Sequence, residues 1–336
     1  MNAGKGYGTV SIAGGRIITQ GDRADGSFVI AYDPKNGSEV WATRNAPVYP
    51  NTRGGGPRGT PTIDGDLTYA VSGAGDVICV ESATGKKVWG FNMFEQFQGK
   101  NPHWGCSESP LVEKDLLIIT PGGKVATVAA LEKKTGKPVW LAAIGDPAGY
   151  SSAVACDAGG VRQVVAVTAK SVIGVSAADG KVLWRYTGTP KGSALNGVAN
   201  IASPIVRGDH VFFSSNYGAG AVLLKIEKDG EGLKATEVYF TKAMQNHHAT
   251  SLLLDDRLYG TSGNPTVNLV CMKFLTGEVV YPKDEERRTQ GFQKSGIVFA
   301  DGRIYCLGEE GEAALAEANP EKLVVRSKFQ AFPPKP

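Results

Sequence analysis

Short apolar runs separated by turn residues extend along the whole chain. In the segment 62–91, apolar runs at 67–72, 76–81 and 87–91 are preceded or separated by Asp-Gly-Asp and Thr-Gly-Lys turns. Glycine supplies positive φ in such turns, and runs of this length rich in Val, Ile, Leu and Tyr are typical of strands. The pattern therefore predicts antiparallel meanders of four short strands.

A turn glycine followed four residues later by tryptophan marks the end of each meander. The phrase ends at Trp41, Trp89, Trp140 and Trp184, so that successive tryptophans are 48, 51 and 44 residues apart, and a variant of it ends at Tyr281. A fixed period in this range is typical of stacked repeats such as propellers. We expect each aromatic ring to fill the wedge between neighbouring blades and its N–H to find a carbonyl.

Seven such units can be counted, and they predict an all-β fold, a β-propeller of four-stranded antiparallel blades. An eighth blade is expected if an unrecognised segment completes it. The fifth and seventh units lack the tryptophan, and 237–240 and 322–325 replace its segment. We predict one domain over residues 1–332, followed by a Pro-rich tail at 333–336. The units begin near Gly8, Gly59, Ser107, Ser151, Ala202, Ala249 and Ser295.

Charge and cysteine content narrow the function classes. The 336 residues carry a net charge of only +3 with no basic run, which argues against nucleic acid or an anionic membrane as partner. The mixed charges at 284–288 indicate a solvated loop. Cys79, Cys271 and Cys306 lie in apolar runs, where buried free thiols are expected. The chain shows no apolar stretch long enough to span a bilayer and no signal peptide.

The loops that precede the first strand of each blade are predicted to meet around one mouth of a central channel. These loops contain aromatic, amide and cationic side chains, which in a concavity indicate a ligand site. A polar mouth that merely satisfies backbone ends is an equally good interpretation. The ligand-binding candidates are Arg58, Trp104, Tyr150, Ser151, Asn196, Asn200, Asn246 and Lys294.

Glu108 is the acid–base candidate of these loops. Burial beside Trp104 would raise its pKa and suit a general acid or base, whereas pairing with Arg58 would lower the pKa and make the pair structural. The sequence leaves both open. His103, His247 and His248 are weak metal-ligand candidates, because adjacent histidines on an extended segment point to opposite sides and no zinc-type spacing occurs.

The segment from Ala130 to Trp140 resembles the repeat of pyrroloquinoline-quinone-like propellers, and the resemblance covers nearly the whole chain. That superfamily holds quinoprotein alcohol dehydrogenases and a non-enzymatic lipoprotein of outer-membrane assembly. Segments 104–110 and 244–248 resemble bacterial secreted members, which implies a periplasmic or secreted protein.

In the dehydrogenases, the resemblance implies a quinone held between a Trp and a vicinal disulfide, with calcium bound by Glu, Asn and Asp. By this resemblance, Trp104 would stack on the quinone, and Glu108 with either Asn196 or Asn200 would bind calcium. However, this sequence has no adjacent cysteine pair and no Asp in the mouth loops. These departures weaken the hypothesis that PQQ with calcium is the cofactor, and the cofactor is unknown.

Three functions remain open at this point, and whether the protein is an enzyme is among the open questions. The first is a small-molecule-binding propeller whose ligand is anionic or sugar-like, with an oxidoreductase acting on alcohols or sugars as its catalytic form. The second is a non-catalytic scaffold, which should expose an apolar patch to a protein partner. The third is a metal-dependent hydrolase or lyase that uses His103, His247 or His248.

Overall fold

The computed structural model describes residues 2–189, 192–263, 266–283 and 291–333. The charge run 284–288 and the end of the Pro-rich tail lie outside the described residues. The described part divides into two compact units. The first contains Met1–Ala155, Arg162–Thr168 and Val172–Leu183, and the second contains Cys156–Val161, Ala169–Ser171 and Trp184–Pro336.

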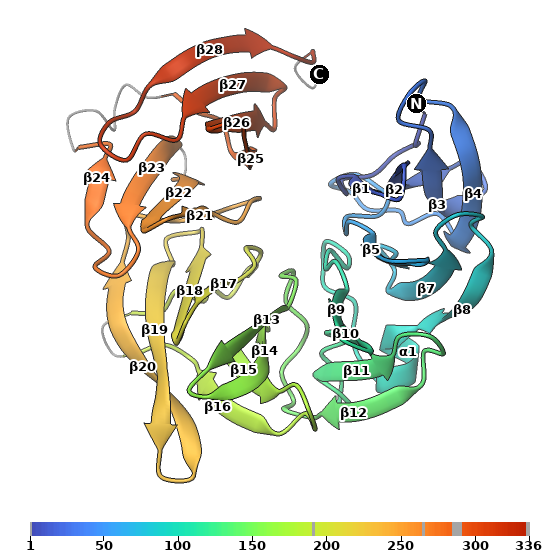
Figure 1. Cartoon of the computed structure of the whole chain (residues 1–336), viewed down its shortest axis with the longest axis horizontal. Helices are drawn as coiled ribbons and strands as arrows, with labels where there is room; N and C mark the ends of the chain where they lie inside the picture. The colour runs from blue at the N-terminus through green and yellow to red at the C-terminus, as the bar shows by residue number, and fades with distance from the viewer. Residues whose placement is uncertain (1, 190–191, 264–265, 284–290, 334–336) are drawn as a thin grey trace. The chain divides into compact units, whose positions relative to one another are not determined.

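Seven four-stranded sheets make up the described chain, and in each sheet the strands are ordered as they follow one another in the sequence. Three sheets belong to the first unit, where β1, β5 and β9 form the inner edges and β4, β8 and β12 the outer edges (Figure 1). Their strands are β1 (Ser11–Ala13), β2 (Arg16–Arg23), β3 (Gly26–Tyr32), β4 (Glu39–Ala46), β5 (Thr62–Asp64), β6 (Leu67–Val71), β7 (Asp76–Glu81), β8 (Lys87–Asn92), β9 (Leu111–Glu113), β10 (Leu116–Ile119), β11 (Val128–Glu132) and β12 (Pro138–Ala142).

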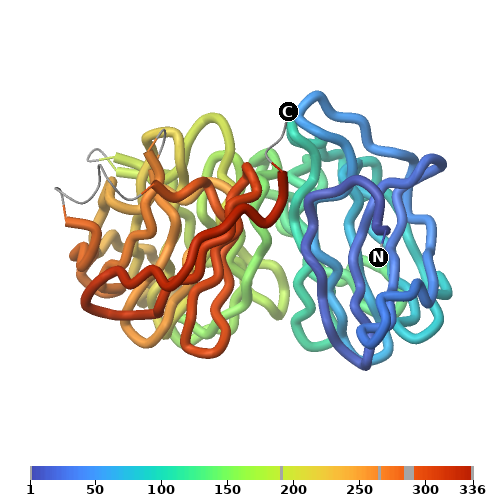
Figure 2. Tube along the Cα trace, turned by 90° about the horizontal axis from the view of Figure 1, so that it is seen from above, coloured from blue at the N-terminus to red at the C-terminus, as the bar shows by residue number. Residues whose placement is uncertain are grey.

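The remaining four sheets follow the same up-and-down course, which the tube in Figure 2 traces. The fourth sheet contains β13 (Val154–Ala158), β14 (Val161–Val167), β15 (Val172–Ser176) and β16 (Val182–Tyr186). The last three contain β17 (Ile205–Arg207), β18 (His210–Ser215), β19 (Gly220–Asp229), β20 (Gly232–Thr241), β21 (Leu252–Leu254), β22 (Arg257–Ser262), β23 (Asn268–Lys273), β24 (Val279–Tyr281), β25 (Ser295–Ala300), β26 (Arg303–Gly308), β27 (Glu312–Glu317) and β28 (Val325–Gln330). The predicted all-β propeller of four-stranded blades is confirmed.

One short helix, α1 (Met93–Phe97), stands out among the described residues. Asn92 caps it, because its side-chain oxygen accepts the backbone N–H groups of Phe94 and Glu95, two of the donors that a helix start leaves unpaired. Met93 and Phe97 are buried in the core between the second and third sheets. No helix in the described part of the chain is long and apolar enough to cross a membrane.

Apolar side chains fill the space between successive sheets. Ile18, Val29 and Ala31 of the first sheet pack with Ile78 and Val80 of the second, and the next pairs of sheets repeat the arrangement. A sheet with a neighbour on each side therefore buries both of its faces, as the dense apolar runs of its middle strands require. All five cysteines are buried, and Cys79, Cys271 and Cys306 are free thiols, which confirms the prediction for these three.

The outer aromatic residue of a sheet donates a hydrogen bond to a carbonyl of the next sheet. The indole N–H of Trp41 donates to the Ser82 carbonyl at 3.1 Å, and that of Trp89 donates to Lys133 at 3.0 Å. In the second unit Tyr239 takes this part, because its hydroxyl donates to the Phe274 carbonyl at 2.9 Å. The wedge role expected for the repeated aromatics is confirmed, and it extends to a unit without tryptophan.

The turn glycine of the repeat provides the surface on which that aromatic ring lies. At Gly136 φ is +73°, and an added Cβ would lie 2.8 Å from the Trp89 ring. Any side chain at this position would meet both a strained backbone and the neighbouring ring. The same contact joins Gly85 to Trp41, Gly180 to Trp140 and Gly277 to Tyr239.

A second link joins the inner edges of successive sheets. In it, a backbone N–H before one sheet donates to the Ser or Thr hydroxyl that precedes the next sheet. Thr9 N donates to Thr60 Oγ1 at 3.2 Å, and Thr60 N donates to Ser109 Oγ at 2.9 Å. Ser109 N donates in turn to Ser152 Oγ at 2.9 Å. From the first sheet to the fourth, a hydroxyl residue that precedes the first strand therefore joins neighbouring sheets.

We predict that Gly136→Ala lowers the free energy of unfolding by roughly 2–4 kcal/mol, since the left-handed backbone and the displaced Trp89 ring both cost energy. Gly145→Ala is the matched control. Its φ is +81° but nothing lies within 4 Å of an added Cβ, so it should cost only about 1 kcal/mol. Urea denaturation measures both, and equal losses would contradict the ring contact.

Candidate functional site

Arg58 lies between two tyrosine rings in the loops of the first unit. Its guanidinium carbon is 5.4 Å from the Tyr7 ring centroid and 5.3 Å from that of Tyr49. Its terminal nitrogens donate to the carbonyls of Gly56 at 2.6 Å and Gly54 at 2.7 Å. Arg58 therefore holds its own loop and carries a cation between two aromatic faces, an arrangement that favours stacking interactions.

Trp104 and Tyr150 form the second half of this aromatic cluster. Their ring centroids are 5.8 Å apart, and the backbone N–H of Trp104 donates to the Tyr150 hydroxyl at 3.3 Å. His103 lies edge-on to Trp104 at 5.1 Å. Burial raises the pKa of Tyr150, so its hydroxyl stays protonated at neutral pH. The cluster presents aromatic surface with hydrogen-bonding groups at its edges.

Tyr49 connects the two halves. An added Cβ at Gly105 would lie 2.6 Å from the Tyr49 ring, and Gly105 has φ +88°, so only glycine lets the loop of Trp104 approach so closely. Sequence reasoning missed Tyr49 because its loop follows β4 and was not among those placed at the mouth. Its position before Pro50 in a turn-rich stretch was the available signal.

Glu108 is 4% exposed and is held by one neighbour. Its carboxylate accepts the Thr120 backbone N–H at 3.1 and 3.0 Å and also the Thr120 hydroxyl. Burial raises its pKa to about 7, and the bonds from Thr120 offset part of that rise. Arg58 donates to loop carbonyls instead of pairing with Glu108. Of the two alternatives for Glu108, the structure therefore shows the buried carboxyl with a raised pKa.

Ser151, the residue after Tyr150, is buried. Its hydroxyl donates to the Ser152 carbonyl at 3.1 Å, and the neighbouring Ser107 hydroxyl donates to the Tyr150 carbonyl at 2.7 Å. These bonds join the loop of Trp104 to the loop of Tyr150. The structure therefore brings Arg58, Trp104, Tyr150 and Ser151 into neighbouring loops of one unit.

The asparagine candidates lie in the second unit, where their side chains form hydrogen bonds with backbone groups. Asn196 accepts the backbone N–H of Val198 at 2.7 Å and donates to the Ala199 carbonyl at 2.6 Å, while Asn200 accepts Asn196 N at 3.0 Å. Asn246 is buried, donates to the Thr261 carbonyl at 3.2 Å and accepts the Ser251 hydroxyl at 2.9 Å. These contacts shape the loops.

His247 and His248 lie in contact, with ring centroids 4.0 Å apart. The expectation that they point to opposite sides is wrong, because residues 247–249 form a bend and the alternation of an extended strand does not apply. His247 Nε2 is 2.8 Å from the Tyr217 hydroxyl. Burial, with the nearby charges of His248 and Lys294, lowers the pKa of His247 to about 3, so the ring is neutral at pH 7.

Lys294 and His248 both lie near Glu309. The Lys294 ammonium is 3.9 Å from one Glu309 oxygen, and His248 Nδ1 is 3.7 Å from the other. The carboxylate partly neutralises the charge that Lys294 would offer an anion. Among the described residues, no group of three or more His, Cys, Asp or Glu side chains is arranged to hold a metal ion.

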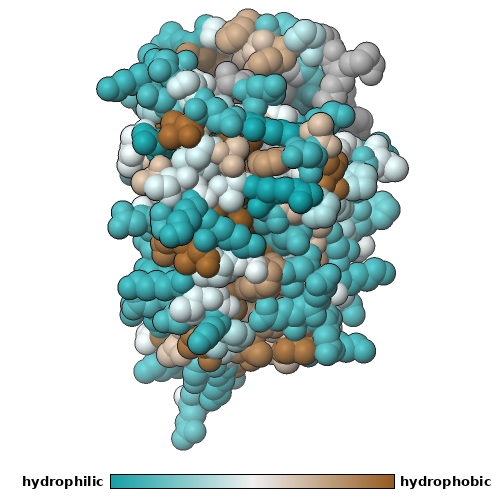
Figure 3. Space-filling view, turned by 90° about the vertical axis from the view of Figure 1, so that its right-hand side faces the viewer, coloured by the Kyte–Doolittle hydropathy of each residue, from teal (hydrophilic) through white to brown (hydrophobic). Residues whose placement is uncertain are grey.

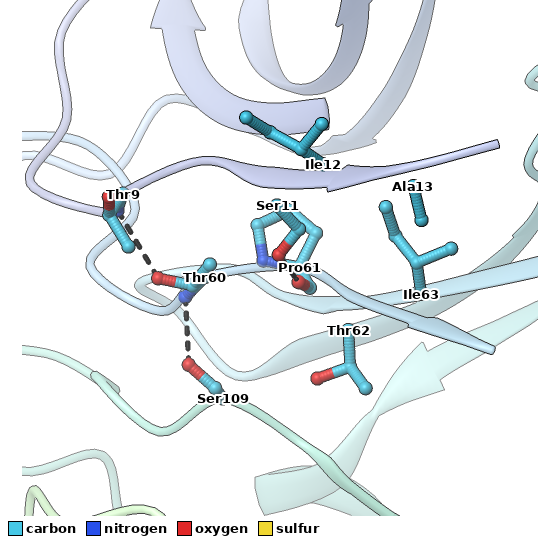
Figure 4. Close-up of a pocket in the computed structure, with 9 residues that line it drawn as sticks. All are labelled: Thr9, Ser11, Ile12, Ala13, Thr60, Pro61, Thr62, Ile63 and Ser109. Carbon is cyan, nitrogen blue, oxygen red and sulfur yellow. Dashed lines mark hydrogen bonds between the residues drawn. The ribbon is translucent and has the colours of Figure 1, made fainter. Parts of the chain in front are cut away.

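A groove of about 510 Å³ runs along the inner strands of the first unit, beside β1 and β5 (Figure 4). Thr9, Thr60 and Ser109 line one end, and Ile12 and Ile63 lie farther along it. Tyr7 and Arg58 each precede one of these threonines by two residues, so the groove begins next to the aromatic cluster. The sequence interpretation placed chemistry in the loops and gave this strand surface no role.

A family model described as outer membrane protein assembly factor BamB matches residues 25–281. The chain belongs to this family. The match spans the repeats that carry the turn glycine and the outer aromatic. The resemblance to pyrroloquinoline-quinone-like propellers is confirmed, and no curated protein matches the chain.

Solved structures show the same fold at low identity. BamB from Moraxella catarrhalis is 16% identical with a TM-score of 0.68, over 96% of this chain and 87% of that one. The computationally designed Ika8 protein is 11% identical with a TM-score of 0.67, over 100% and 89%. The quinohemoprotein alcohol dehydrogenase ADHIIG from Pseudomonas putida HK5 is 13% identical with a TM-score of 0.58, over 98% and 67%. These likenesses concern the fold.

We predict a pH dependence of stability that originates at Glu108. Its pKa rises from 4.5 to about 7 in the folded chain, so between these values the folded state keeps a proton that the unfolded state has released. Stability from this group is therefore full below pH 4.5 and is lost as the pH rises through 7, by on the order of 3 kcal/mol.

Glu108→Gln should remove this slope, because a neutral amide has no proton to release. Urea denaturation between pH 5 and pH 8 measures the effect, with Glu132→Gln on an exposed strand end as control. An unchanged slope in Glu108→Gln would show that the carboxyl does not titrate in this range.

Proposed function

We propose that the protein is a non-catalytic, small-molecule-binding propeller of the BamB-like family, exported to the periplasm or secreted. The observation that carries this proposal is the aromatic cluster of Tyr7, Tyr49, Arg58, Trp104 and Tyr150. Aromatic and cationic groups converging from separate loops are the usual composition of a binding site.

The surface of this cluster supports the proposal because part of it remains open to solvent. Tyr7 is 52% exposed although its ring lies against the Arg58 guanidinium. An exposed ring fixed by a cation stacks on a ligand at little entropic cost, since it is ordered before binding. The geometry therefore favours a ligand with a flat face, which would stack on Tyr7 or Trp104.

Glu108 acts in this proposal as a positioning residue. Its carboxylate ties the segment that follows Trp104 to Thr120, the residue after β10, and it is almost fully buried. A group used in this way fixes the loop and leaves ligand contact to the aromatic residues. Binding without turnover is the function that this arrangement supports best.

We expect Tyr7→Ala to weaken ligand binding about three- to tenfold, because one stacking face of the site is lost. A thermal-shift screen of sugars, alcohols, sugar acids and quinones identifies a ligand, since stabilisation grows with its concentration over the dissociation constant. Tyr305→Ala, which changes an exposed tyrosine of β26 in the second unit, is the matched control. Equal stabilisation of Tyr7→Ala and the unaltered chain would refute the site.

A protein-binding scaffold is the second candidate, and the sheet β25–β28 favours it. Cross-strand pairing places Val298, Tyr305, Leu307 and Phe329 on one face. Val298 is 58%, Leu307 46% and Phe329 60% exposed. An apolar sheet face of this kind is typical of an interaction surface. On the side of the molecule shown in Figure 3, by contrast, apolar and polar side chains are interspersed.

This candidate predicts that the chain, exported to the periplasm of a bacterium without its own BamB, restores outer-membrane resistance to detergent. Leu307→Glu should abolish the rescue, because a charge on the apolar face cannot be desolvated without a partner. Val88→Glu changes an exposed valine of the first unit and should retain it. Rescue by Leu307→Glu equal to that of the unaltered chain would exclude this face.

A further inference from the structure

The groove beside β1 and β5 is lined by uncharged side chains alone. The hydroxyls of Thr9, Thr60 and Ser109 line one end, and Ile12, Ala13 and Ile63 line the other. Between them, the hydroxyls of Ser11 and Thr62 donate to the carbonyls of Pro61 and Pro110. A charged ligand in this groove would lose hydration without gaining an ion partner, which is costly. The groove therefore selects an uncharged ligand.

Several of these hydroxyls keep hydrogen-bonding capacity. The Thr60 and Ser109 oxygens each accept a backbone N–H, from Thr9 and Thr60 respectively, and their own O–H groups have no acceptor among the described residues. The Thr9 hydroxyl likewise has no bonding partner there. Because a hydroxyl both donates and accepts, a row of them pairs best with ligand groups that also do both.

The aliphatic part of the groove adds a second requirement. Ile12 is 69% exposed on β1, and Ile63 faces the same space from β5. A large exposed isoleucine beside a row of hydroxyls suits a ligand that carries apolar C–H faces as well as polar groups. Sugar rings combine the two, with hydroxyls around the ring edge and C–H groups on its faces.

The aromatic cluster lies at the end of this groove. Tyr7 and Thr9 are on one segment, Arg58 and Thr60 are on the neighbouring one, and the Tyr7 backbone N–H donates to the Pro57 carbonyl at 2.8 Å. The exposed ring of Tyr7 is therefore two residues along the chain from the hydroxyl end of the groove. The groove has a volume of about 510 Å³ and is widely open to solvent along its length.

We propose that the ligand of this protein is an uncharged oligosaccharide, with one sugar stacked on Tyr7 and the following sugars in the hydroxyl-lined groove. The proposal rests on the proposed function and names its ligand class. An extended neutral peptide is the competing occupant, but the groove offers side-chain hydroxyls and isoleucines in place of the paired backbone groups through which peptides bind strand edges.

Isothermal titration calorimetry with neutral hexasaccharides tests this ligand class, using cellohexaose, laminarihexaose and mannohexaose. At least one should bind, and Thr9→Val should weaken it about three- to tenfold, because one ligand hydrogen bond is lost. Ile12→Asp should weaken it at least tenfold, because the carboxylate must be desolvated. Both positions are exposed, so neither change removes core packing. Thr187→Val, an exposed threonine in the second unit, should bind as the unaltered chain does.

The choice of probes distinguishes failure of the proposed ligand class from failure of the proposed function. Binding of hexagalacturonate or of a neutral Gly-Ser-Val hexapeptide, with no binding of the neutral sugars, would overturn the ligand class but leave a small-molecule binder. Sugar binding unaffected by Thr9→Val and Ile12→Asp would place the ligand outside the groove. Absence of binding by every probe, together with no stabilising compound in the wider screen, would overturn both.

Discussion

The contact between an outer aromatic ring and the turn glycine of the next sheet is the constraint on which the rest of the structure depends. Trp89 shows its two components, a ring lying on Gly136 and an indole N–H donating to the Lys133 carbonyl. The ring requires that no side chain be present, and the hydrogen bond fixes its orientation. Within each compact unit, this contact sets successive sheets against one another, and the inner-edge links from Thr9 to Ser152 accompany that stacking.

Stacked sheets bring loops from distant parts of the sequence together, and the loops then use their polar groups on one another. Glu108 bonds to Thr120, Arg58 to its own loop and Asn246 to Thr261 and Ser251. Among the loops and inner strands around Arg58, the side chains left exposed include the Tyr7 ring and the Thr9 hydroxyl. This division explains why binding, without catalysis, is the function that we assign to the first unit.

The sequence interpretation succeeded where a side chain has one physical use. A repeated Trp after a turn glycine has one evident role, which is to fill the space between neighbouring sheets, and the structure confirms this role. It failed at His247 and His248, because their relative direction depends on a bend that no local signal marks. It left open the environment of Glu108, because burial and an Arg58 ion pair are both compatible with the same residues.

The sequence by itself determined the all-β repeat, the four strands of each unit, the aromatic positions and the buried thiols. These follow from short-range patterns, since strand alternation, turn glycines and apolar runs act over a few residues. Only the tertiary structure decided that Tyr49 joins the aromatic cluster, that Thr120 holds Glu108, and that a groove lies beside β1 and β5. Each of these depends on contacts between residues far apart in the chain, whose distances no local pattern encodes.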